Sequence, residues 1–205
     1  MDYRLFFPAT QNNKKYIGDV LSNINLKKGS ILEIGSGSGE HSIEFQKRFK
    51  EIIWQTSDPN YNHRKSISSW INHEKLNKIM PEPLEIDVTR TPWKIPNKIK
   101  YNLQAVISIN MIHIAPWKCT ICLFKESGRL LNISKFVILY GAFKIKNKHI
   151  SDSNYLFDQS LKKQNSNWGV RNLEEVNHQA TINGFIHKSL IKMPANNFMV
   201  IYQKV

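Results

Sequence analysis

The chain has 205 residues, 41% of them hydrophobic, which is enough for one domain with a substantial apolar core. Its formal net charge is +13, but the lysines are scattered among asparagine and isoleucine and form no long basic block. We therefore do not expect nucleic acid to be the partner. No apolar run is long enough to span a bilayer and no secretory leader pattern is present, so we expect a cytoplasmic protein without a membrane partner.

The two cysteines form a single C-x-x-C pair at Cys119 and Cys122, and no second pair completes a metal site. The histidines are dispersed along the chain. The sequence therefore predicts no metal, and structural or incidental thiols are favoured over a redox pair.

The first predicted element is an amphipathic helix from Thr10 to Ile24, within an N-terminal helical segment that we place at residues 1–28. A short apolar strand follows at residues 31–34 and contains one acid, Glu33. A helix is predicted from Glu40 to Phe49. Between this strand and this helix, three glycines alternate with two serines, at Gly35, Ser36, Gly37, Ser38 and Gly39.

This glycine turn, residues 35–39, predicts a ligand-binding site. Glycines allow positive φ angles and let a ligand approach the backbone closely, and the helix N-terminus behind them offers unpaired amide donors. The spacing is G-x-G-x-G, whereas a dinucleotide fold has G-x-G-x-x-G. The carboxylate of Glu33 suits a ligand with an ammonium or sulfonium charge better than a pyrophosphate. A plain strand-to-helix turn is the alternative.

Acidic residues follow the next two predicted strands. Asp58 ends a strand that begins at Ile52, and it lies roughly 20 residues beyond the glycine turn, where an acid would hydrogen-bond ribose hydroxyls. Its alternative role is a helix cap or a turn before Pro59. Asp87 ends a third predicted strand that starts at Leu84, and a simple turn aspartate ahead of Thr89 explains it equally well.

Two further strands, residues 105–109 and 136–141, are apolar throughout, as strands covered on both faces of a parallel sheet are. Ligands of such sheets bind over the carboxyl ends of the strands. Five side chains fall at these ends, and their convergence is the main argument for a site: Glu33, Asp58, Asp87, Asn110 and Tyr140.

The rest of the chain completes an alternation of helices and strands that is typical of an α/β fold. Helices are predicted at residues 117–131 and 173–183, and a final pair of strands at 185–192 and 198–204. The stretch from Asn147 to Arg171 is the least regular, and we expect it to form an insert over the site.

These residues resemble class I methyltransferases that use S-adenosylmethionine (SAM). Over nearly the whole chain they are similar to one family, the domain of unknown function 938 proteins, also called methyltransferase-like 26 proteins. The matching stretches are Pro8-Ala9 with Asn13-Lys14, Leu32 to His41, Trp54-Gln55, Ser57-Asp58-Pro59, Asp87-Val88-Thr89, Asn110 to Trp117, Leu123-Phe124, Tyr140-Gly141, Ser153-Asn154, Phe157-Asp158, Trp168-Gly169, Arg171 and Met193 to Asn197.

The resemblance implies a single SAM-dependent methyltransferase domain over residues 1–205. Its fold would be a Rossmann-like three-layer sandwich with a mostly parallel seven-stranded sheet and an antiparallel last strand. The chain departs from the family at Asn12, Glu40 and Ala142, where the family usually has Arg, Gln and Pro. The loss of Arg at Asn12 weakens any grip of that position on an anionic acceptor.

The resemblance also implies the cofactor, SAM, with S-adenosylhomocysteine as its product. Asp87 would receive the adenine amino group, and the amide of Val88 would donate to the ring. The full set of residues that we expect to bind the cofactor is Glu33, Gly35, Ser36, Gly37, Gly39, Asp58, Asp87, Val88 and Asn110.

On the acceptor side, His113 is the candidate general base because its ordinary pKa lies near neutrality, with Tyr140 as a second candidate. Alternatively, His113 only hydrogen-bonds and orients the acceptor. Arg171 is the third expected catalytic residue. The acceptor pocket is predicted to include Asn13, Trp117, Trp168 and Asn196, although core packing explains Trp117 and a turn explains Asn196 equally well.

We therefore expect an enzyme that methylates a small molecule. The Asn/Asp-Pro-Pro-aromatic motif of adenine and glutamine methylases is missing after Asn110, which argues against those reactions. Two alternatives stay open: an RNA or protein methyltransferase that uses the basic charge, and a SAM-binding protein without catalysis.

Overall fold

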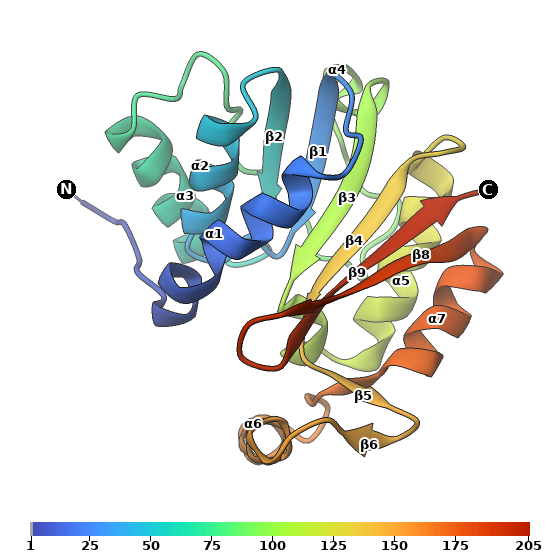
Figure 1. Ribbon diagram of the computed structural model, residues 1–205. Helices are drawn as coiled ribbons and strands as arrows, with labels where there is room; N and C mark the ends of the chain where they lie inside the picture. Colours follow the sequence, from blue (N-terminus) through green and yellow to red (C-terminus); the bar gives the residue numbers. More distant parts are fainter. Residues whose placement is uncertain (1) are drawn as a thin grey trace. The chain divides into compact units, whose positions relative to one another are not determined.

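The computed structural model describes residues 2–205 (Figure 1); Met1, with which the expected domain and its N-terminal segment begin, lies outside the described residues. The described residues form two compact units, one that ends at Ile107 and one that runs from Ser108 to Val205. That the chain acts as one methyltransferase domain stays a prediction.

The first unit is built on parallel strands in the order β2-β1-β3. Strand β1 pairs with β2 from Gly29↔Ile52 to Ile34↔Ser57, and with β3 from Ser30↔Leu103 to Glu33↔Ile107. The elements of this unit are α1 (Pro8–Ser22), β1 (Gly29–Ile34), α2 (Glu40–Arg48), β2 (Ile52–Ser57), α3 (Tyr61–His73), α4 (Asn97–Lys100) and β3 (Leu103–Ile109), whose last residues open the second unit.

The apolar runs identified in the sequence form the core of this unit. Ile31, Leu32 and Trp54 are completely buried, and β3 is buried along its whole length. Burial on both faces explains why these strands lack a polar face, as is usual for parallel strands covered by helices. The carboxyl ends of β1 and β2 therefore lead directly into the turns that carry the predicted acids.

The third predicted strand, at Leu84, is wrong as an extended element. Only Leu84 pairs with its neighbour, through hydrogen bonds from its amide to the Thr56 carbonyl at 3.0 Å and from the Asp58 amide to its own carbonyl at 3.1 Å. Pro81 and Pro83 cannot donate to a ladder before it. After it, the chain turns at Asp87. The central strands therefore number six among the described residues, not seven.

The second unit contains antiparallel strands in the order β4-β9-β8 and a separate small sheet in the order β6-β5-β7. Strand β9 is antiparallel to β4, from Phe136↔Gln203 to Gly141↔Phe198, which confirms the antiparallel last strand. The elements are η1 (Met111–His113), α5 (Trp117–Leu130), β4 (Phe136–Gly141), β5 (Phe143–Ile145), β6 (Lys148–His149), α6 (Asp152–Gln164), β7 (Arg171–Asn172), α7 (Leu173–Ile182), β8 (Phe185–Met193) and β9 (Asn197–Lys204).

Helices α5 and α7 lie side by side in the second unit, and α7 packs on β8 (Figure 1). The two units thus give the α/β fold with mostly parallel central strands that the sequence predicts. Among residues 2–205, no helix combines the length and the apolar character needed to cross a membrane.

The stretch from Asn147 to Arg171 is more regular than predicted, because it contains the 13-residue helix α6. The Ser151 hydroxyl caps this helix by accepting a hydrogen bond from the Asn154 amide at 3.2 Å. The side chains that α6 buries include the polar Asn154 and Asp158. Its inward face is therefore not apolar, and hydrophobic periodicity could not reveal it.

Candidate functional site

The glycine turn joins β1 to α2 through backbone conformations that favour glycine. Gly37 and Gly39 have φ angles of +58° and +91°. A Cβ atom on Gly39 would come within 2.9 Å of the Ile67 side chain, so glycine here lets α3 approach the start of α2. The Ser36 and Gly39 amides of the turn donate to the carbonyls of Ser57 and Ser36, at 2.9 and 3.1 Å, and the Gly37 amide donates to an acceptor from outside the turn.

Asp58 is that acceptor. Its Oδ2 atom accepts a hydrogen bond from the Gly37 amide at 3.0 Å, which joins the end of β2 to the glycine turn after β1. Its Oδ1 atom accepts from the Asn60 amide at 2.9 Å and lies 3.1 Å from His63 Nδ1. The structure therefore brings two predicted cofactor residues into direct contact, and it also contains the turn at Pro59 that was the alternative reading of Asp58.

Glu33 lies in the interior of the first unit and is only 1% exposed. Its Oε2 atom accepts hydrogen bonds from the Ser42 hydroxyl at 2.5 Å and from Trp54 Nε1 at 2.7 Å. Burial raises the pKa of Glu33 to about 7, against the opposing effect of these two donors. The side chain thus ties β1 to α2 and β2, a structural role that the sequence analysis did not identify.

Asp87 forms the turn that was the alternative explanation for it. Its Oδ1 atom accepts from the amide and the hydroxyl of Thr89, at 2.9 and 2.8 Å. It also lines a pocket of about 610 Å³ together with Pro59, Ile86 and Trp93. Val88 is buried, and its carbonyl accepts a hydrogen bond from Trp93 Nε1 at 3.1 Å. Charged side chains also line the pocket, among them Arg90, whose Nε lies 3.4 Å from Asp87 Oδ2. A carboxylate is thus present where the base of a nucleoside is expected.

Asn13, which we predict in the acceptor pocket, lies between two helices of the first unit, and its role toward the acceptor stays a prediction. It is buried on α1, and its Oδ1 atom lies 2.6 Å from Nε2 of His41 on α2. Burial, together with the charge of Lys14, lowers the pKa of His41 to about 4, so this imidazole is neutral and donates to Asn13. The pair fixes α1 against the helix that follows the glycine turn.

In the second unit, the backbone brings Asn110, His113 and Tyr140 together. Asn110 has a φ angle of +59°, and its amide donates to the Tyr140 carbonyl at 2.8 Å. The residue after Tyr140 must be small: a Cβ on Gly141 would come 2.1 Å from His113 Nε2 and 3.0 Å from Asn110 Oδ1. Gly141 is therefore a site residue that the analysis of single motifs missed.

His113 is fully buried, and neither of its ring nitrogens has a hydrogen-bond partner among the described residues. Its ring meets Phe143 edge-on, with centroids 5.4 Å apart. Burial, assisted by the charge of Arg171, lowers the pKa of His113 to about 3 and makes the imidazole neutral at pH 7. A buried hydrogen-bonding group without a partner costs free energy. A ligand that forms a hydrogen bond with the His113 ring would remove that cost, which makes His113 a candidate ligand contact.

Arg171 is far from His113 in the sequence, and it binds backbone carbonyls on either side of His113. Its guanidinium donates to the carbonyls of Ile112 and Asn167, both at 2.9 Å, and to that of Ala115. The Gly169 amide donates to the His113 carbonyl at 2.9 Å. Arg171 therefore holds the turn that carries His113, while its role in catalysis stays a prediction.

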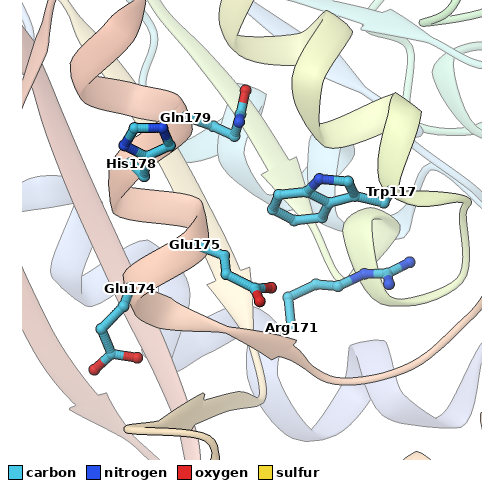
Figure 2. A pocket seen from close by; sticks show the side chains of 6 residues that line it. All are labelled: Trp117, Arg171, Glu174, Glu175, His178 and Gln179. Carbon is cyan, nitrogen blue, oxygen red and sulfur yellow. The ribbon is translucent and has the colours of Figure 1, made fainter.

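Arg171 also lines a pocket of about 600 Å³ with Trp117, its guanidinium carbon 5.8 Å from the centroid of the Trp117 ring. Figure 2 shows this pair facing each other, with Glu175 beside them. The other lining residues come from α7: Glu174, His178 and Gln179. Two predicted residues are thus brought together at one surface pocket.

Trp168 and Asn196 do not line that pocket. Trp168 is half-buried in a turn that its amide closes by donating to the Asn165 carbonyl at 2.9 Å. Asn196 is exposed at the tip of the β8–β9 hairpin, where its Nδ2 donates to the Ser153 hydroxyl at 3.1 Å. Asn196 thus connects the hairpin to α6, and a role of either residue in the acceptor pocket stays a prediction.

Three solved structures similar to the chain are described as methyltransferases. An O-methyltransferase family protein from Burkholderia thailandensis is 10% identical with a TM-score of 0.77, over 96% of this chain and 57% of that one. The mitomycin 7-O-methyltransferase MmcR is 11% identical with a TM-score of 0.77, over 95% and 54%. Human N-acetylserotonin methyltransferase, solved in complex with SAM, is 13% identical with a TM-score of 0.74, over 96% and 52%.

The chain therefore spans about half the length of these proteins, and at such identities the likeness establishes the fold alone. A family match covers residues 4–204. Since this is nearly the whole sequence, the chain belongs to the family described as Protein of unknown function (DUF938).

Proposed function

We propose that the protein is a SAM-dependent methyltransferase that acts on a small-molecule acceptor. The observation that carries the proposal is the hydrogen bond from the Gly37 amide to Asp58 Oδ2, at 3.0 Å. It joins the glycine turn after one parallel strand to an acid at the end of the next, the arrangement expected for binding the ribose of a nucleoside. The fold shared with solved methyltransferases, one of them in complex with SAM, supports the same reading.

The residue types found in the first unit are chemically suited to such a cofactor. Asp58 would accept hydrogen bonds from the ribose hydroxyls. The pocket beside Pro59 and Ile86 would take the adenine ring, with Asp87 next to its amino group. The glycine turn would admit the amino-acid end of the molecule close to the backbone. When bound, SAM supplies a methyl group on a sulfonium, which is electrophilic without further activation.

His113 is the residue that we propose to position the acceptor. As a neutral imidazole without a hydrogen-bond partner among the described residues, it has a lone pair able to accept a hydrogen bond from an acceptor hydroxyl. Its lowered pKa disfavours the imidazolium that proton abstraction would create, so we assign it the orienting role and not that of a general base. Asn110 and Tyr140 would orient the acceptor, and Arg171 would hold the turn of residues 111–115 in place. Since methyl transfer needs little covalent help, positioning is the larger contribution of these residues.

Calorimetry tests the cofactor assignment. We expect the protein to bind SAM and S-adenosylhomocysteine, and NAD negligibly. The variant Asp58→Ala should weaken SAM binding by about 1.5–3 kcal/mol, the scale for losing hydrogen bonds to a charged group. Asp19→Ala is the matched control, because Asp19 is an exposed acid whose carboxylate accepts a hydrogen bond from Arg48 at 2.8 Å. Binding of NAD without SAM, or equal SAM affinity in the two variants, would refute the assignment.

Radiolabelled SAM tests the reaction. Label should pass from SAM into a small-molecule fraction of a metabolite extract and not into RNA or protein. Transfer into RNA or protein would favour the alternative methyltransferases. SAM binding without any transfer would favour a non-catalytic SAM-binding protein.

A further inference from the structure

The first residues of the described chain form an extended strap along helix α3. Within this strap, defined as residues 2–7, the Arg4 amide donates to Asp2 Oδ1 at 3.1 Å, whereas the amides of Tyr3, Leu5 and Phe7 donate to side chains outside the strap. Tyr3 donates to the Ser69 hydroxyl at 3.3 Å, Leu5 to the Ser66 hydroxyl at 2.8 Å, and Phe7 to a Glu40 carboxylate oxygen at 2.7 Å. The strap is therefore fixed in register before α1 begins.

The last residue of the strap, Phe7, lies on the glycine turn. A Cβ on Gly37 would come 3.2 Å from the Phe7 ring, so the ring is in contact with the backbone at this glycine. On its other side, Phe7 meets the His63 ring edge-on, with centroids 5.9 Å apart, and His63 contacts Asp58. Phe7 remains 39% exposed, so it covers the Gly37–Asp58 hydrogen bond without being part of the apolar core.

Glu40 holds Phe7 in this position. It is only 4% exposed, and its Oε2 atom accepts from the Phe7 amide and, at 2.9 Å, from the Ser38 hydroxyl. Its Oε1 atom accepts from the Gln11 side chain at 2.6 Å. A single carboxylate thus connects the strap, helix α1 and the glycine turn.

We infer that Phe7 is a cofactor-contacting residue, whose ring closes over the nucleoside bound at Gly37 and Asp58 and is positioned by Glu40. The inference rests on the proposed function and deepens it. A cofactor at the glycine turn contacts Phe7, and its departure requires the ring to move. The strap therefore governs mainly the dissociation rate, where most differences in affinity between related complexes arise.

Stopped-flow dissociation of S-adenosylhomocysteine tests this role without any acceptor. Phe7→Ala should release the ligand about tenfold faster than the wild-type protein. Phe6→Ala is the matched control: Phe6 is 60% exposed and packs on Trp70, with centroids 5.1 Å apart, so its removal should change the rate by less than about twofold. Phe7→Tyr keeps the ring and should restore the slow release.

Glu40→Ala tests the positioning of Phe7 separately, because it removes the acceptor of the Phe7 amide but keeps the Phe7 side chain. It should accelerate release as Phe7→Ala does. If the wild-type protein binds the ligand but Phe7→Ala and Phe6→Ala release it at equal rates, the role of Phe7 is overturned and the proposed function is not. A wild-type protein that binds neither SAM nor S-adenosylhomocysteine would overturn the proposed function and the role of Phe7 with it.

Discussion

At the scale of single residues, Glu33 is a carboxyl group kept in the interior by two donors, Ser42 and Trp54. Its burial raises its pKa from the ordinary value of 4.5 to about 7. Because the folded protein then holds the proton more tightly than the unfolded chain does, Glu33 contributes stability below about pH 4.5 that is lost as the pH rises toward 7.

The variant Glu33→Gln isolates this effect. The free energy of unfolding of the wild-type protein, minus that of the variant, should fall by about 1.4 kcal/mol per pH unit between about pH 5 and pH 7. Urea denaturation at several pH values measures it. The lowered pKa values of His41 and His113 give an opposite slope, but they do so in both proteins and cancel in the difference. A difference that stays constant with pH would contradict a raised pKa of Glu33.

Residue types at strand ends could be read from the sequence, but their partners could not. Asp58 was placed correctly at the end of β2 and contacts the glycine turn. The donors to Glu33 and the contact of Phe7 with Gly37 join positions far apart along the chain, and they depend on how α2, α3 and the strap pack. Hydrophobic periodicity carries no information on such contacts.

At the scale of elements, the turn between β3 and α5 depends on a residue of β7. In this turn, the carbonyls of Ile112 and Ala115 accept hydrogen bonds from the guanidinium of Arg171. The planar fork of arginine suits several acceptors at once, which the point charge of lysine does not. Arg171 is thus expected to act on His113 by positioning its turn.

Arg171→Ala should lower the stability by about 1–3 kcal/mol, because it leaves the partly buried carbonyls of Ile112 and Ala115 without their donor. Turnover should fall strongly, whereas SAM affinity should stay within about threefold, an effect below 1 kcal/mol. Arg171→Lys should recover part of the stability but little of the turnover. Urea denaturation, calorimetry and the transfer assay measure the three quantities. A loss of SAM affinity equal to the loss of turnover would contradict a positioning role.

The sequence analysis was wrong about the strand at Leu84 and missed helix α6, each for a physical reason. The strand at Leu84 was predicted from its apolar residues, but flanking prolines and the Asp87 turn limit it to a single bridge. Helix α6 was missed because Tyr155, Leu156 and Phe157 are exposed while Asp158 is buried, the reverse of an amphipathic pattern. Asp158 is instead held by Lys162 and by the Val170 amide, at 2.6 and 2.8 Å.

At the scale of the whole molecule, the net charge of +13 raises the question of an anionic partner. Part of the basic charge is already paired on the surface, for example Lys47 with Glu74 at 2.5 Å and Arg64 with Glu85 at 2.7 Å. Such exposed pairs add little stability, but each neutralises one positive charge. The remaining lysines are scattered along the sequence without a long basic block, so we expect weak attraction to phosphates and not a shaped site for nucleic acid.

Binding to RNA should accordingly be weak and governed by salt. Scattered lysines displace counterions without reading bases, so affinity for a fluorescent single-stranded RNA should fall by about tenfold or more between 50 and 200 mM salt. Fluorescence polarisation with two RNAs of unrelated sequence measures this, and the two should bind equally. Excess unlabelled RNA should leave SAM affinity unchanged at physiological salt, because a small-molecule acceptor needs no RNA surface. Tight binding that distinguishes the two sequences at physiological salt would instead assign the basic charge to a nucleic-acid substrate and favour an RNA methyltransferase.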